Sequence, residues 1–222
     1  MIKVCDIQKI SGYFLTVDFE KAFDSLNHNF FIMLLKNYGF GEDFIDWIKI
    51  LLRDQESCVI NGGDTTTYFC LESGARQGDP ILAYLFTLAL ELFFMLIKSN
   101  KNIHGINIFN HDFLYTAYAD DTTFFLKDLD SVKNVLEMLN QFYMVSGLRP
   151  NFSKCEIAGI GSLKDAKVAL CGLKSLDLTK ESIKILGVHI SYNKKLQDDI
   201  NFCMTVKNIC NVIKLWRMRI YF

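Results

Sequence analysis

The alternation of apolar and polar side chains along residues 12–19 (GYFLTVDF) is typical of a β-strand, whose successive side chains point to opposite faces. The two faces carry Leu15, Val17 and Phe19 on one side and Phe14, Thr16 and Asp18 on the other. Two further β-rich runs, 113–119 (FLYTAYA) and 122–126 (TTFFL), flank the adjacent residues Asp120 and Asp121. The pattern predicts three strands, with Asp18 at the end of the first and a turn at the aspartate pair joining the other two.

Other segments show helical spacing of apolar residues or β-rich runs between turn residues. The predicted helices cover residues 29–40, 42–54, 130–147 and 194–219, with Gly39 and Gly147 placed to end the first and third. Further strands are predicted at 154–160 and 183–191, and a hairpin is predicted to turn at Gly62, Gly63 and Asp64 between 57–62 and 65–71.

The apolar segment that begins at Pro80 (PILAYLFTLALELFFMLIKS) is nearly long enough to cross a bilayer. Tyr84, Thr87 and Glu91 recur along it and form a polar stripe on one side of a helix. Pro80 suits the first turn, where its missing N–H is not needed. A buried helix with one polar edge fits this pattern better than a membrane span, and we expect no membrane partner.

The organisation of the chain is that of one continuous domain, because it contains no repeats and only two prolines, Pro80 and Pro150. Hairpins and helices are mixed and do not repeat as βα units. The sequence therefore predicts an α+β fold, in which helices cover one face of a sheet.

The charge of the chain is balanced: 222 residues, half of them hydrophobic, carry a formal net charge of −1. The chain as a whole therefore lacks the basic charge that would by itself indicate a nucleic-acid partner. The seven cysteines include no Cys-x-x-Cys pair, and the N-terminus lacks the apolar stretch of a signal peptide. We expect reduced thiols in an intracellular protein, in either the nucleus or the cytoplasm.

Asp18 and Asp120 each follow a predicted strand, so their carboxylates converge if the two strands are neighbours. Carboxylate oxygens suit Mg²⁺, which prefers six oxygen ligands and is commonly shared with substrate phosphates. Two such ions about 4 Å apart activate an attacking oxygen and neutralise a leaving one. The alternative is a plain polar turn at Asp120 and Asp121, since aspartate is common in turns. The spacing alone leaves both interpretations open.

Several segments resemble, in the same order, the motifs of the reverse transcriptases of non-LTR (LINE-type) retrotransposons. LTVDFEKAFDSLNH (15–28) resembles their first catalytic motif, and SGARQGDPILAYLF (73–86) resembles the Arg-Gln-Gly motif that holds the incoming nucleotide and the template. AYADDTTFF (117–125) is similar to the catalytic hairpin. GLRPNFSKCEI (147–157) and IKILGVHIS (183–191) resemble the lysine motif and the primer grip.

The resemblance implies a fold, the palm of a right-handed polymerase with an antiparallel sheet backed by helices. It runs from about Gly12 onward, so the fingers that precede this point in the family are expected to be missing. KLWRMR (214–219) resembles the start of the thumb. We expect residues 1–192 to form the palm and 193–222 to begin a helical thumb, as part of a longer protein. Basic fingers and thumb would then supply much of the phosphate contact that this chain lacks.

The resemblance also implies roles at the catalytic centre. Asp18 and Asp120 would bridge both metal ions, with the carbonyl of Phe19 as a further ligand. Asp121 would be a catalytic residue with a more peripheral side chain. Lys154 would protonate the pyrophosphate leaving group, or it is one more exposed lysine.

Substrate-binding roles follow from the same resemblance. Phe23 would stack under the nucleotide sugar and exclude a 2′-hydroxyl, although its aromatic ring alone also fits a core position. Gln77 and Gly78 precede a helix start, where free backbone N–H groups allow a nucleotide to approach closely. Arg76 would contact template or phosphate, or form a surface salt bridge. Tyr118 is the remaining residue of the expected substrate site.

The implied activity is that of an RNA-directed DNA polymerase, in which a primer 3′-hydroxyl attacks the α-phosphate of a deoxynucleoside triphosphate. The expected partners are an RNA template, a DNA primer and the triphosphate, with fingers, thumb and endonuclease segments of a longer protein. The expected cofactors are two Mg²⁺ ions, with Mn²⁺ as the alternative ion. The alternative function is a truncated or decayed retroelement product that folds as a palm without polymerase activity. Intron maturases and telomerase catalytic subunits are less similar in RQGDPIL and KAFDSLNH.

Overall fold

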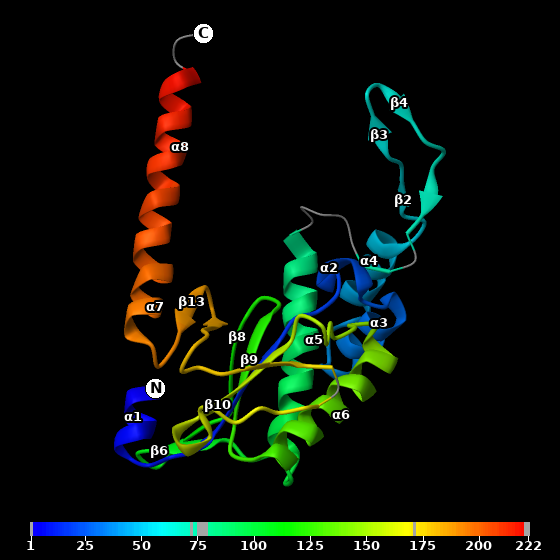
Figure 1. The fold of residues 1–222 in the computed structure, drawn as a ribbon. Coiled ribbons are helices and arrows are strands. Elements are labelled where there is room, and N and C mark those ends of the chain that lie inside the picture. The colour runs from blue at the N-terminus through cyan, green and yellow to red at the C-terminus, as the bar shows by residue number, and fades with distance from the viewer. Residues whose placement is uncertain (1, 72, 75–79, 171, 220–222) are drawn as a thin grey trace. The chain divides into compact units, whose positions relative to one another are not determined.

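The computed structural model describes residues 2–71, 73–74, 80–170 and 172–219, and Figure 1 shows its elements. The chain divides into two compact units, which we describe separately. The sheet unit comprises Met1–Asp18, His104–Val132 and Phe152–Phe222. The helical unit comprises Phe19–Ile103 and Lys133–Asn151.

The centre of the sheet unit is a five-stranded sheet in the order β11-β10-β1-β9-β8. Its strands are β1 (Gly12–Val17), β8 (Tyr115–Tyr118), β9 (Asp121–Leu126), β10 (Glu156–Ile160) and β11 (Lys174–Leu176). Neighbouring strands are antiparallel except β10 and β11, which are parallel. β1 therefore lies between β9 and β10, and the mixture of helices with a mostly antiparallel sheet confirms the predicted α+β class.

One face of this sheet forms part of the unit's hydrophobic core. Phe14 from β1 and Phe125 from β9 meet edge to face, with ring centroids 5.3 Å apart. Helix α1 (Ile2–Ile7) and the hairpin of β6 (Ile106–Ile108) and β7 (His111–Phe113) contribute apolar side chains to the same cluster. The sequence pattern did not predict α1, β6 or β11, because each is too short to show a period.

The C-terminal part of the sheet unit is a hairpin followed by a helix. β12 (Ile183–Ile185) and β13 (Val188–Ile190) pair only with each other. The prediction of one strand through 183–191 is wrong, since Leu186 and Gly187 both have positive φ and form a turn. The predicted C-terminal helix is confirmed as α7 (Lys194–Asp198), a π-helical segment (Asp199–Met204) and α8 (Thr205–Arg219).

The helical unit contains four predicted helices in order: α3 (His28–Asn37), α4 (Glu42–Leu52), α5 (Pro80–Ser99) and most of α6 (Leu129–Ser146). They are preceded by the short helix α2 (Ala22–Ser25), which the sequence pattern did not predict. An extended arm pairs β2 (Glu56–Ser57) with β5 (Phe69–Cys70) and β3 (Ile60–Asn61) with β4 (Asp64–Thr65). Gly62 and Gly63, both at positive φ, turn this arm as predicted.

Helix α5 has the predicted two sides. Leu85, Phe86 and Phe93 are buried, whereas Tyr84, Thr87 and Glu91 are exposed. Among the residues that the structure describes, no helix combines the length and the apolar character needed to span a membrane.

Candidate active site

The strand register sorts the side chains of one sheet face into rows that run across the strands. One row is apolar: Phe14 lies between Phe125 and Ala158, and Ala158 pairs with Leu176. Two residues further along each strand, side chains return to the same face. The face therefore carries a second row one step nearer to the end of β1.

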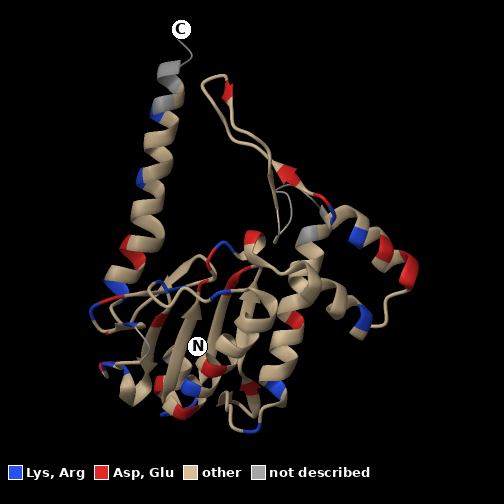
Figure 2. Cartoon of the chain, turned by 90° about the vertical axis from the view of Figure 1, so that its right-hand side faces the viewer, with Lys and Arg blue, Asp and Glu red and all other residues tan. Residues whose placement is uncertain are grey.

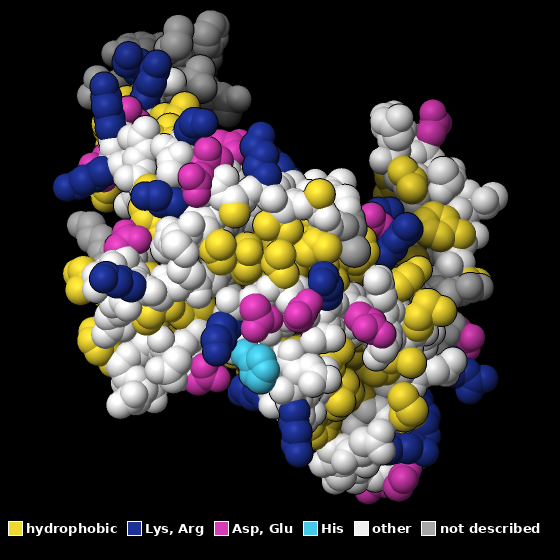
Figure 3. Space-filling model, turned by 60° about the horizontal axis from the view of Figure 1, so that its bottom comes forward, with side chains coloured by type: hydrophobic (Ala, Val, Ile, Leu, Met, Phe, Trp, Pro, Cys, Tyr) yellow, Lys and Arg dark blue, Asp and Glu magenta, His cyan; other side chains and the backbone are white. Residues whose placement is uncertain are grey.

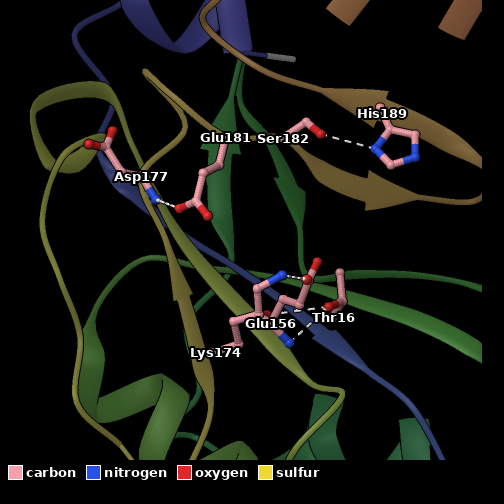
Figure 4. Close-up of polar contacts among 7 residues, drawn as sticks. All are labelled: Thr16, Glu156, Lys174, Asp177, Glu181, Ser182 and His189. Atoms are coloured by element: carbon pink, nitrogen blue, oxygen red, sulfur yellow. Dashed lines mark hydrogen bonds and ion pairs between the residues drawn. The ribbon is translucent and has the colours of Figure 1, made fainter. Parts of the chain in front are cut away.

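This second row is polar and crosses all five strands: Thr116, Thr123, Thr16, Glu156 and Lys174 are successive partners. Lys174 Nζ donates to Glu156 Oε1 at 2.8 Å. Figure 4 shows how the Thr16 side chain meets the backbone of Glu156, whose N–H donates to Thr16 Oγ1 at 3.1 Å. The Glu156 carboxylate is thus neutralised by Lys174 of β11, and this ion pair holds the side chain beside the pocket.

The third row holds three of the four predicted catalytic residues, Asp18, Asp121 and Lys154. Val17 pairs with Thr122, so the next residue, Asp18, lies opposite Asp121. Thr16 pairs with Glu156, so Asp18, two residues further along, lies opposite Lys154 on the other side. The contact with Lys154 is an ion pair, with Nζ 3.6 Å from Asp18 Oδ2. Asp18, Asp121 and Lys154 come together because the end of β1 meets the starts of β9 and β10.

These three side chains open into one pocket of about 270 Å³, entirely within the sheet unit. Its floor is the polar row and the strand ends, and its remaining wall is the β12–β13 hairpin. The lining residues are Thr16, Val17, Asp18, Asp121, Thr122, Thr123, Lys154, Glu156, Lys184, Leu186 and Gly187. The pocket is therefore polar, with carboxylates and ammonium groups facing one another.

Asp18 carries a carboxylate oxygen that accepts no hydrogen bond at the pocket. This Oδ2 atom is buried, and it has the Lys154 ammonium 3.6 Å away as an ion-pair partner. A buried carboxylate oxygen normally has a donor or a cation, because desolvation without compensation is costly. Carboxylate and carbonyl oxygens are the ligands that Mg²⁺ prefers, so the donor chemistry of Asp18 and Asp121 fits a divalent ion. No cluster of three or more His, Cys, Asp or Glu side chains arranged for a metal occurs in the described part of the chain.

Asp120 lies in the predicted turn between β8 and β9. The preceding residue, Ala119, has a φ of 51°, and the strand pairing resumes with Tyr118 opposite Asp121. Asp120 is half-buried and does not line the pocket, whereas Asp121 does. The relative roles of the two aspartates stay a prediction, and in the structure Asp121 lines the same pocket as Asp18.

Cys155 lies between Lys154 and Glu156 and is buried. Its Sγ donates a long hydrogen bond of 3.9 Å to the backbone carbonyl of Asp18. Burial raises the pKa of the Cys155 thiol to about 11. The thiol is therefore neutral at physiological pH and acts as a structural contact behind the carboxylate, with no nucleophilic thiolate.

The other predicted residues lie elsewhere. Phe23 belongs to the helical unit, where its ring contacts Phe86 at a centroid distance of 4.6 Å. Phe19 is buried and forms an isolated bridge with Pro150 in the same unit. Tyr118 ends β8 with a side chain that is 76% exposed. The predicted Arg76, Gln77 and Gly78 lie outside the described residues.

Sequence reasoning missed the residues that complete the pocket. Lys184 alternates with the buried Ile183 and so reaches the pocket from β12. Leu186 and Gly187 reach it only because the chain turns between β12 and β13. Gly187 after Leu186 was the one sign of this turn in the sequence. Because apolar and polar residues alternate before and after it, the segment was interpreted as one continuous strand.

The surface of the chain carries both charge signs. Figure 2 shows Lys and Arg interspersed with Asp and Glu among the strands and loops, and basic residues along the C-terminal helix. Hydrophobic side chains also gather at the surface (Figure 3). On α8 the exposed apolar residues include Val206, Ile209, Ile213 and Trp216, and on α4 they include Trp47. The described surface therefore offers no single basic field, as the composition indicated.

Comparison with known proteins identifies similar sequences among reverse transcriptases and transposon proteins. A family model described as "Reverse transcriptase (RNA-dependent DNA polymerase)" matches residues 2–190. The "Transposon TX1 uncharacterized 149 kDa protein" of Xenopus laevis is 33% identical over 186 residues, which is 82% of this chain and 14% of that protein. The "Retrovirus-related Pol polyprotein from type-2 retrotransposable element R2DM" of Drosophila melanogaster is 26% identical over 206 residues, covering 90% of this chain and 18% of that protein. The chain thus spans less than a fifth of either relative.

Solved structures with a similar fold include telomerase from Candida tropicalis. The structure of that telomerase in complex with a fragment of telomeric RNA aligns with 77% of this chain and 29% of the telomerase chain, with a TM-score of 0.56 and 15% sequence identity. The apo form truncated from its C-terminal domain covers 85% of this chain and 36% of its own at a TM-score of 0.57 and 12% identity. At such identities the similarity concerns the fold alone.

Proposed function

Because the chain belongs to the reverse transcriptase (RNA-dependent DNA polymerase) family, we propose that it is the palm segment of an RNA-directed DNA polymerase encoded by a non-LTR retrotransposon. The relatives named as transposon and retrotransposable-element proteins support the retrotransposon origin. We further propose that residues 1–192 act as the palm and 193–222 begin a thumb, within a longer protein with fingers and an endonuclease. The helix that starts with α7 at Lys194 supports this boundary.

The proposed reaction joins a primer 3′-hydroxyl to the α-phosphate of a deoxynucleoside triphosphate, with RNA as template. Members of this family generally use divalent metal ions. Two Mg²⁺ ions, or Mn²⁺ in their place, would be held by Asp18, Asp120 and Asp121, with the Phe19 carbonyl as a further ligand. When bound, such ions activate the attacking oxygen and neutralise the leaving one. The protein itself positions the reactants and supplies fixed charges, since phosphoryl transfer asks for little covalent chemistry from side chains.

One observation carries this proposal. Asp18 and Asp121 reach the same pocket from adjacent antiparallel strands, and the buried Asp18 Oδ2 has no hydrogen-bond partner. A polar turn alone would not explain a buried carboxylate oxygen that accepts no hydrogen bond and has only the Lys154 ammonium near it, 3.6 Å away. Lys154 is close enough to Asp18 to reach a phosphate in the same pocket, which supports its proposed role as proton donor to pyrophosphate.

Substrate selection is proposed for residues outside the pocket. Phe23 would exclude ribonucleotides, while Tyr118, Arg76, Gln77 and Gly78 would contact the nucleotide or template. The exposure of Tyr118 is compatible with substrate contact. A protein with a similar fold, the telomerase of Candida tropicalis, was solved in complex with a fragment of telomeric RNA, which is compatible with a nucleic-acid partner.

The test is primer extension by the longer protein that carries these 222 residues. Wild-type protein is expected to extend a DNA primer on an RNA template only when Mg²⁺ or Mn²⁺ is present. Asp18→Asn should lower the rate by at least about 10³-fold, because both metal coordination and transition-state charge stabilisation are lost. Asp165→Asn, at an exposed aspartate that does not line the pocket, is the matched control. A wild-type protein with no extension under any of these conditions would instead favour the decayed retroelement product.

A further inference from the structure

The outer edge of strand β13 meets two amide side chains from the C-terminal helix. Asn201 makes a paired contact with His189: its Oδ1 accepts from the His189 N–H at 2.8 Å, and its Nδ2 donates to the His189 carbonyl at 2.7 Å. Gln197 Oε1 accepts from the N–H of Ser191 at 3.1 Å. The two amides are four residues apart on the helix, and their partners are two residues apart, at His189 in β13 and at Ser191 directly after its end. They take the place that a further strand would occupy beside β13.

The helix is locally altered where this contact is made. α7 (Lys194–Asp198) and α8 (Thr205–Arg219) are separated by the π-helical segment Asp199–Met204, which contains Asn201. A π turn widens the helix by one residue and frequently marks a functional position. Here it coincides with the side chain that reaches across to β13.

The hairpin depends on such contacts for its position. β12 and β13 pair only with each other and do not extend the five-stranded sheet. Ile183 of β12 belongs to the core cluster, and the buried Ser191 hydroxyl lies within hydrogen-bond distance of the carbonyls of Leu178 and Glu181. Figure 4 shows the other side of His189, whose Nδ1 lies 3.0 Å from Ser182 Oγ. The backbone at His189 is thus held by Asn201 where it would otherwise be a free strand edge.

The hairpin also forms a wall of the carboxylate pocket, through Lys184, Leu186 and Gly187. Lys184 is the cross-strand partner of His189. A displacement of the helix that carries Asn201 therefore moves His189, and through the strand pairing it moves Lys184 at the pocket. Simple protection of a strand edge would require only that the edge be covered. Asn201 does more than cover the edge: it makes two hydrogen bonds to His189, the residue that pairs with Lys184 of the pocket, and so connects the helix to the pocket wall.

We propose that Asn201 is a positioning residue that fixes the β12–β13 hairpin to the C-terminal helix, so that the hairpin wall of the pocket and the helix move as one body. Gln197 supports the same attachment with a single hydrogen bond. The consequence for catalysis rests on the proposed polymerase function, because it assumes that substrate occupies the pocket that Lys184 lines. The attachment itself does not rest on that function.

The attachment is tested by hydrogen exchange of backbone amides in the 222-residue chain. In Asn201→Ala the amide of His189 should exchange about tenfold faster, because two hydrogen bonds that oppose local opening are lost. The cross-strand amides of β12 should be less affected. Asn208→Ala changes an exposed asparagine two turns further along the helix and serves as the control. Unchanged exchange at His189 in Asn201→Ala would overturn the proposal.

Isosteric variants separate the coupling from general stability. Gln197 uses only its acceptor in this contact, so Gln197→Glu keeps the hydrogen bond, whereas Asn201→Asp loses the donor and sets a charge beside the His189 carbonyl. In the longer protein, Asn201→Asp should lower the single-turnover rate from a preformed primer–template complex about fivefold. The KM for the triphosphate and the thermal midpoint should stay near those of Gln197→Glu.

The outcomes are distinguishable from those of the proposed function. Equal turnover rates in Asn201→Asp and Gln197→Glu, with active wild-type protein, would refute the coupling. A wild-type protein that extends no primer would refute the proposed function instead, and exchange at His189 then decides the attachment by itself.

Discussion

Replacing Asp18 by asparagine separates the charge of this side chain from its place in the fold. The ion pair with Lys154 is partly exposed, at 39% for Asp18 and 68% for Lys154, so its loss costs about 0–1 kcal/mol. The buried Oδ2 without a hydrogen-bond partner carries a desolvation penalty of about 1–3 kcal/mol that a neutral amide lessens. We expect Asp18→Asn to raise the free energy of unfolding by about 1 kcal/mol.

The assay is thermal unfolding of the variant beside wild type and Asp165→Asn. For a chain of this size, about 1 kcal/mol corresponds to a shift of roughly 2–4 °C in the unfolding midpoint. Mg²⁺ or Mn²⁺ should raise the midpoint of wild type and of Asp165→Asn, because an ion that binds only the folded state stabilises it. The response should be strongly reduced in Asp18→Asn.

Two results would refute this reasoning. A loss of more than about 2 kcal/mol in Asp18→Asn would show that the ion pair outweighs the desolvation penalty. A cation response equal to that of wild type would show that the ion binds elsewhere. The second result counts against the metal site even if the stability change agrees with expectation.

Three further predictions concern single side chains. Cys155 should resist alkylation at pH 8 while the exposed Cys70 reacts. Burial raises the Cys155 pKa from 9.0 to about 11, so the contribution of the neutral thiol to the free energy of unfolding should be complete below pH 9 and be lost as the pH rises toward 11. Cys155→Ala should abolish this pH dependence in unfolding measurements. Phe23→Val should cost about 1–2 kcal/mol through its contact with Phe86; an unchanged preference for deoxynucleotides over ribonucleotides in primer extension would contradict its role as a gate. Gly159→Ala should cost about 3 kcal/mol or more in urea unfolding, since a Cβ there would overlap the Leu163 carbonyl oxygen, whereas Gly41→Ala has open space and should be tolerated; equal stabilities would contradict this.

Residues with a clear period were placed correctly from the sequence. The alternation along β1 predicted Asp18 at a strand end, and the β-rich runs around Asp120 predicted the turn between β8 and β9. The polar stripe of α5 predicted which side of that helix is exposed. Each of these features depends on local geometry, which a short window of sequence contains.

Features that depend on pairing between distant segments could not be predicted in the same way. Alternation through 183–191 is the same for one strand and for a two-stranded hairpin, so the turn at Leu186 and Gly187 stayed hidden. The partner of Glu156 comes from β11, a strand of three residues in parallel pairing. The partner of His189 comes from a helix whose π turn no period reveals.

The adjacent aspartates illustrate where local reasoning ends. Alternation along β8 assigns Asp120 to the face of Tyr118, and alternation along β9 assigns Asp121 to the face of Thr123. Both lines lead to the same face, because Tyr118 pairs with Asp121 across the hairpin. Which carboxylate enters the pocket then depends on the turn, and the positive φ of Ala119 makes Asp120 a turn residue while Asp121 begins the strand opposite Asp18. A backbone angle at a residue without a functional group therefore decides which acidic side chain lines the pocket.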